Sequence, residues 1–66
     1  MAHLARPGDR VRRVAAGFEH FTGLVTSVDH DWVCHVLMKS PANEKGKISI
    51  MAQEEVKIIE FAEDRD

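Results

Sequence analysis

The alternation of apolar and polar residues along the chain predicts five short β-strands and no helix of ordinary length. The strands are expected over residues 10–14, 21–29, 32–38, 46–51 and 56–59. In the first strand Val11 is expected to point inward. The third strand is apolar on both faces, and Trp32, Cys34, Val36 and Met38 share one of them. A strand of this kind is covered on both sides in a folded protein.

Turn residues and glycines divide these strands. Pro7-Gly8-Asp9 is a turn that precedes the first strand, and Gly46 opens the fourth. Gly23 lies near the start of the second strand, where a barrel strand bends sharply or lets another backbone approach. Residues 52–55 form a one-turn break before the last strand. We therefore expect an all-β fold, a five-stranded SH3-like small barrel with a short 3-10 turn before its last strand.

The chain of 66 residues has room for one domain. We expect a flexible N-terminal arm over residues 1–6, the barrel over residues 7–61 and an acidic tail over residues 62–66, with neither arm nor tail in the core. A domain this short buries only about 60% of its unfolded surface. Since the single cysteine excludes an intramolecular disulfide, we expect a second copy of the chain to cover the outer face of the third strand.

The net charge of −2 conceals a gradient from a basic start to an acidic end. If the first and last strands are neighbours, these charges complement each other across the strands. The acidic balance disfavours a nucleic-acid partner, because phosphate binding needs a basic excess. No apolar stretch approaches the roughly 20 residues that span a bilayer, and the first residues lack the apolar segment of a secretory signal. A lone buried thiol is typical of a cytoplasmic protein.

A group of titratable residues suggests metal binding, but their spacing argues against it. Cys34 and His35 are neighbours on a predicted strand, so their side chains point to opposite faces. Cys34 also alternates with Trp32 and Val36, which is the pattern of a core residue rather than of a nucleophile. We therefore predict neither a metal site nor a catalytic residue. The residues considered are His20, His30, Cys34, His35, Asp29 and Asp31.

Trp32 and the early arginines are the other candidates. Trp32 is flanked by Asp29 and Asp31, which favours packing in the core or at a subunit interface over stacking on a nucleic-acid base. Arg12 and Arg13 point to opposite faces of the first strand. Two interpretations stay open for them: solvated arginines that pair with the acidic terminus, or a site for phosphate or carboxylate.

Three segments carry a resemblance to a known family. They are Gly8-Asp9-Arg10-Val11-Arg12, Phe21-Thr22-Gly23-Leu24-Val25, and Gly46-Lys47-Ile48-Ser49-Ile50-Met51 followed by Val56. Over most of residues 8–59 the chain resembles the small bacterial type II dihydrofolate reductases carried on plasmids and integron cassettes, which are built on an SH3-like barrel.

The resemblance implies a homotetramer whose central pore holds folate and a nicotinamide cofactor. The family's pore segment, Val-Gln-Ile-Tyr, falls on residues 48–51, where Ser49 replaces the glutamine and Met51 replaces the tyrosine. Arg13 matches the charge of the family's cofactor-contacting residue, and Phe21 stands in place of its interface tryptophan. The candidate ligand-binding residues are therefore Arg12, Arg13, Ser49, Ile50 and Met51, and the candidate interface residues are Phe21 and Trp32.

Because the residues that contact ligand in that family differ here, the sequence favours a small non-catalytic SH3-like interaction module without a cofactor. Such a module is expected to self-associate and to bind a protein segment or a small ligand. Two alternatives remain, a reductase-like oligomer that uses NADPH and a small barrel that binds nucleic acid.

Overall fold

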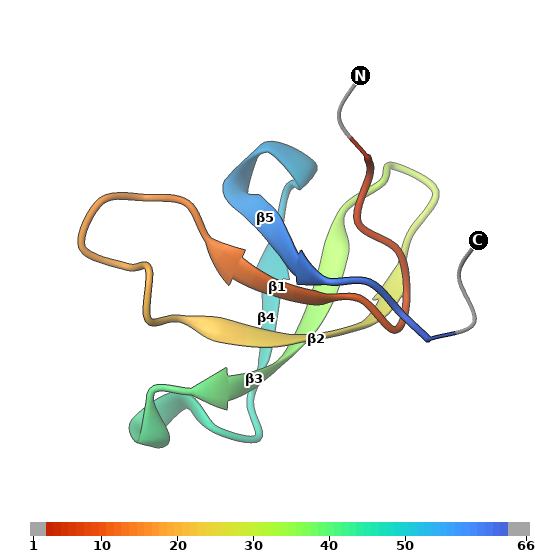
Figure 1. The fold of residues 1–66 in the computed structure, drawn as a ribbon. Coiled ribbons are helices and arrows are strands. Elements are labelled where there is room, and N and C mark those ends of the chain that lie inside the picture. The colour runs from red at the N-terminus through yellow and green to blue at the C-terminus, as the bar shows by residue number, and fades with distance from the viewer. Residues whose placement is uncertain (1–2, 64–66) are drawn as a thin grey trace.

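The structure, a computed structural model, describes residues 3–63 and shows five antiparallel strands in one sheet (Figure 1). The strands are β1 (Arg10–Arg13), β2 (Thr22–Val28), β3 (Cys34–Ser40), β4 (Ile48–Met51) and β5 (Val56–Glu60). Two short 3-10 turns accompany them, η1 (Ala42–Glu44) and η2 (Gln53–Glu55). The predicted all-β fold and the 3-10 turn before the last strand are confirmed, whereas η1 lies in a segment predicted as a loop.

The strand order is β4-β3-β2-β1-β5, so β4 and β5 are the two edges of the sheet. In Figure 1, β4 passes behind β1 and β5 at a steep angle, which reflects the strong twist of the sheet. Within residues 3–63 no strand pairing joins β4 to β5, so the sheet is open rather than closed. No helix in this part of the chain is long and apolar enough to cross a membrane.

The core lies on one face of the sheet. Val11 of β1 is 1% exposed, as predicted, and Cys34, Val36 and Met38 of β3 are at most 2% exposed. These are three of the four residues predicted to share one face of the third strand; the fourth, Trp32, is exposed. Four half-buried residues pack against this core, namely Phe21, Val28, Val56 and Ile58. The buried apolar residues are Ala5, Val11, Val25, Cys34, Val36, Met38 and Met51.

Gly23 lies at the close backbone approach that the sequence predicts. A Cβ atom at this position would lie 2.6 Å from the carbonyl oxygen of Leu37 and 2.6 Å from a methyl carbon of Val36. Further along β2, the pairing register with β3 shifts between Val25 and Ser27. Because this irregularity breaks the alternation, Val28 packs against the core instead of following Leu24 on the other face.

The N-terminal arm differs from expectation. Ala5 is 1% exposed and belongs to the core cluster. Its backbone N–H donates to Oε1 of Gln53 at 2.8 Å, and Nε2 of Gln53 donates to the Ala5 carbonyl at 3.0 Å. One amide side chain from η2 thus satisfies both backbone groups, which allows this backbone to be buried. Residues 1–2 and 64–66, the rest of the arm and most of the tail, lie outside the described residues.

Asp9 is the one charged residue that is buried among the described residues, with 0% of its surface exposed. Its Oδ2 accepts the Arg6 N–H at 3.0 Å, and its Oδ1 accepts the Ala62 N–H at 2.8 Å. The carboxylate therefore joins the turn before β1 to the residues that follow β5. The sequence indicates a turn at Asp9 but contains no sign of its second partner, 53 residues away.

Trp32 lies in a turn and not in the third strand, which begins two residues later at Cys34. Its φ angle is 64°, in the left-handed region, and its backbone N–H donates to the Asp29 carbonyl at 2.9 Å. The side chain is 52% exposed. The turn thus removes Trp32 from the core face that its sequence spacing indicated, and a left-handed non-glycine residue costs about 1–2 kcal/mol.

Candidate functional site

An apolar strip crosses the face of the sheet opposite the core. Leu24 of β2 lies opposite Leu37 of β3, and Leu37 lies opposite Ile48 of β4. Cross-strand partners share a face, so these three side chains form a row, and Ile50 extends it along β4. Ile48 is 54% exposed and Ile50 is 56% exposed. We call Leu24, Leu37, Ile48 and Ile50 the outer strip.

The outer strip ends at an unprotected sheet edge. Among residues 3–63, β4 pairs only with β3, and its sequence, Ile-Ser-Ile-Met, contains no charge and no proline. Natural proteins usually protect an edge strand with a lysine, a proline or a bulge, because free backbone groups there pair with other chains. The charges lie outside the strand. Lys45 and Lys47 precede it, and Glu54 and Glu55 follow it.

The three candidate ligand residues of β4 do not form one surface. Ile50 lies on the outer strip, whereas Met51 is 2% exposed, lies opposite Cys34 and belongs to the core. Ser49 is half-buried opposite Val36. Neighbouring residues of a strand point to opposite faces, so a segment of consecutive residues cannot line a single site. A ligand contact by Ser49, Ile50 or Met51 stays a prediction.

Arg12 and Arg13 belong to β1, and β2 and β3 lie between β1 and β4 in the order of the sheet. Nη1 of Arg12 donates to the Arg13 carbonyl at 3.3 Å, and the Arg13 guanidinium lies 6.0 Å from the centre of the Phe18 ring. On the same strand, Arg10 lies 3.5 Å from the Glu60 carboxylate. This ion pair confirms that the first and last strands are neighbours with complementary charges, although an exposed pair contributes little to stability.

The two candidate interface residues lie at opposite ends of β2. Phe21 precedes β2, packs against the core and contacts Phe18 and His20, with ring centres 5.1 and 4.7 Å apart. Trp32 follows β2, in the turn to β3. One compact surface patch therefore does not contain both residues, and a subunit contact by either one stays a prediction.

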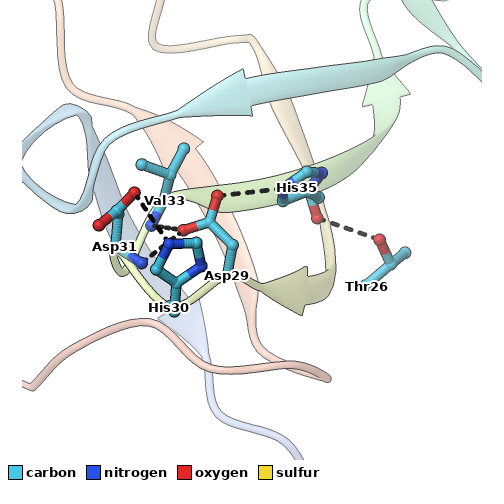
Figure 2. Close-up of polar contacts among 6 residues, drawn as sticks. All are labelled: Thr26, Asp29, His30, Asp31, Val33 and His35. Carbon is cyan, nitrogen blue, oxygen red and sulfur yellow. Dashed lines mark hydrogen bonds and ion pairs between the residues drawn. The ribbon is translucent and has the colours of Figure 1, made fainter.

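A hydrogen-bonded polar turn joins β2 to β3 (Figure 2). Oδ1 of Asp29 accepts the backbone N–H groups of Asp31 and Val33 at 2.9 and 3.1 Å. Its Oδ2 lies 3.5 Å from Nε2 of His35, which occupies β3 opposite Ile50. The pKa of Asp29 is lowered, chiefly by the Val33 hydrogen bond; burial opposes this effect, while Asp31 and His35 add to it.

This turn predicts a pH dependence of stability. Because the folded state lowers the pKa of Asp29, its contribution is present above the ordinary value of 3.8 and is lost as pH falls through the folded value. We expect Asp29→Asn to lower the urea midpoint at about pH 7 and to have a smaller effect at about pH 3. Asp31→Asn, at a side chain 73% exposed, is the control. An Asp29→Asn effect that is equal at both pH values would contradict this cause.

Cys34 is a core cysteine, as the sequence predicts. It is 0% exposed, and burial raises the pKa of its thiol, with the charge of Asp29 adding to the effect. A raised pKa keeps the thiol protonated and a poor nucleophile. Among residues 3–63, no group of three or more His, Cys, Asp or Glu side chains is placed to hold a metal ion.

The outer strip is the surface that sequence reasoning located only in part. The sequence predicts a covered outer face on the third strand, and Leu37 belongs to this face. It does not indicate that Leu24 lies beside Leu37 or that Ile48 and Ile50 are exposed. Comparisons of the chain with protein-family models, with curated proteins and with solved structures find no match.

Proposed function

We propose that the chain is a small, non-catalytic interaction module with an SH3-like arrangement of its five strands, and that it associates with a second copy of itself through β4 and the outer strip. The observation that carries this proposal is an uncharged edge strand whose two isoleucines are more than half exposed. Edge strands of this kind pair with other chains through their free backbone groups. The lone buried Cys34 supports a cytoplasmic setting for the module.

Antiparallel pairing of two β4 strands about a twofold axis fits both the apolar and the charged residues. With Ser49 on the axis, Ile48 lies opposite Ile50 of the second copy, so the two outer strips become continuous. The same arrangement brings the lysines before β4 towards the glutamates that follow β4 in the second copy. Parallel pairing would instead bring like charges together, so the charges favour the antiparallel dimer.

A charge on the outer strip is expected to prevent association. Burying an isoleucine contributes about 1.5–3 kcal/mol, and the dimer contains two copies of Ile50, so Ile50→Lys should weaken association about a hundredfold or more. Light scattering and sedimentation over a range of concentrations measure this change. We expect the unmodified chain to change from monomer to dimer as its concentration rises, over a range of concentrations in which the Ile50→Lys variant stays monomeric.

Ile59→Lys is the matched control, because Ile59 is 50% exposed but lies on β5, at the other edge of the sheet. It should dimerise as the unmodified chain does. Circular dichroism checks that both variants are folded. The proposal fails if the unmodified chain stays monomeric at millimolar concentration, or if Ile50→Lys dimerises as tightly as Ile59→Lys.

A further inference from the structure

The backbone of β4 points alternately towards β3 and towards the free edge of the sheet. The Met38 N–H donates to the Lys47 carbonyl at 2.8 Å, so the carbonyl just before β4 points towards β3. In an antiparallel ladder these directions alternate from residue to residue, so the backbone groups of Ser49 also point towards β3. Those of Ile48 and Ile50 point to the edge. These two residues therefore offer the N–H and C=O groups with which a second strand can pair.

The side chain of Ser49 lies on the core side of β4. Ser49 is half-buried, directly opposite the buried Val36 and two residues before the buried Met51. Its hydroxyl makes no hydrogen bond within the part of the chain that the structure describes. Buried polar groups in folded proteins are hydrogen-bonded. A strand that covers the edge of β4 therefore has to supply a partner for this hydroxyl.

We propose that Ser49 supplies this partner for itself, by pairing with Ser49 of the second copy, and that this pair sets the register of the dimer. The inference rests on the proposed self-association. Ile48 and Ile50 of the second copy exchange both of their backbone hydrogen bonds, so Ser49 occupies a non-hydrogen-bonded position on the twofold axis. The Cα atoms of such a pair are about 4.5 Å apart. Two serine hydroxyls at this separation hydrogen-bond across the strands.

Other registers leave the two hydroxyls apart. With the axis at Ile50, Ser49 lies opposite Met51 of the second copy, whose side chain has no oxygen or nitrogen. With the axis at Ile48, Ser49 lies opposite Lys47, and the lysines before β4 move away from the glutamates of the second copy. A slip of one residue brings opposite faces of the two strands together.

A single polar position thus distinguishes one register from its neighbours, as a buried asparagine does in a coiled coil. It also distinguishes partners. An unrelated edge strand without a hydroxyl at the matching position leaves Ser49 unpaired, so β4 is selective for a second copy of this chain.

Cysteine substitutions test the register directly. Two Ser49→Cys chains should form an intermolecular disulfide under mild oxidation, because a Cα separation of about 4.5 Å lies in the range of disulfides. Ile48→Cys and Ile50→Cys are the controls. Neither residue lies opposite itself in this register, so each should cross-link at least about tenfold more slowly. The native Cys34 is 0% exposed, so the unmodified chain should not cross-link.

Mixed dimers test the selectivity. The Ser49→Ala variant should dimerise about as tightly as the unmodified chain, because both hydroxyls are removed together. A mixed dimer of the two chains leaves one hydroxyl unpaired, so native mass spectrometry should find it about threefold below its random share. Ser27→Ala, at an exposed serine of β2, is the control and should mix at random.

Two results would overturn this inference and leave the proposed self-association standing. In the first, the unmodified chain dimerises, but Ile48→Cys or Ile50→Cys cross-links as fast as Ser49→Cys. In the second, the mixed dimer of the unmodified chain with the Ser49→Ala variant reaches its random share. An unmodified chain that stays monomeric at millimolar concentration removes both the self-association and the register.

Discussion

Asp9→Ala is expected to lower the free energy of unfolding by about 3–5 kcal/mol, because it removes the fully buried carboxylate that accepts two part-buried backbone N–H groups and creates a cavity. The N–H groups belong to Arg6 and Ala62, on segments at the two ends of the fold. A chain of 66 residues has a total stability of about 3–10 kcal/mol. The expected loss is therefore a large part of the total stability of the fold.

Urea unfolding followed by circular dichroism measures this loss. Asp31→Ala is the control, since its side chain is 73% exposed and its replacement should change stability by at most about 0.5 kcal/mol. Asp9→Asn keeps the shape but has one acceptor oxygen in place of two, so its loss should be intermediate and the Ala62 amide should exchange its hydrogen faster. Equal losses for Asp9→Ala and Asp31→Ala would show that the buried carboxylate does not hold the two ends together.

Gly23→Ala is expected to lower the free energy of unfolding by about 2–3 kcal/mol, against the usual gain from replacing a strand glycine. The added Cβ would lie 2.6 Å from the Leu37 carbonyl oxygen. This atom belongs to the backbone of β3, so the clash is relieved only by moving that strand. β3 carries Cys34, Val36 and Met38, and its displacement disturbs the centre of the core.

Gly46→Ala is the matched control for Gly23→Ala. Gly46 has a φ angle of 90°, and a Cβ atom there would meet nothing within 4 Å. Its replacement should therefore cost only the conformational strain, about 1 kcal/mol. Both variants can be compared by thermal and urea unfolding. If Gly23→Ala is no less stable than Gly46→Ala, the close approach of β2 and β3 is not what requires glycine at position 23.

The two edge strands of the sheet, β4 and β5, differ in charge. β4 presents an apolar, uncharged edge, which suits a second copy of the chain. β5 carries Lys57 and Glu60, charged residues of the kind that usually protect an edge strand.

Much of the fold follows from local sequence patterns. Alternation predicts the ends of all five strands to within two residues. It also places Val11 on the inward side of the first strand and Cys34, Val36 and Met38 on one face of the third, and all four are buried. Glycine, which has no Cβ, marked the close approach at position 23. The third strand began too early at Trp32, because a left-handed tryptophan is rare and its sequence spacing continues the strand pattern.

The candidate site was harder to predict. Spacing showed that Ile48 and Ile50 share a face, but a period of two does not indicate which face is buried. The resemblance places residues 48–51 together on one pore segment, whereas the pleat separates exposed Ile50 from buried Met51. The pairing of Lys57 with Arg12 depends on the register between the first and last strands, which no local pattern contains.

The sequence by itself determined the type and order of the elements in this protein, since these depend on interactions between residues close along the chain. Only the tertiary structure decided the burial of Asp9 and Ala5 and the exposed face of β4. Asp9 meets Ala62 and Ala5 meets Gln53 across separations of 53 and 48 residues. Such contacts form only when the strands assemble into the sheet. Until one face of the sheet is packed against the core, nothing in a single strand distinguishes its buried face from its exposed face.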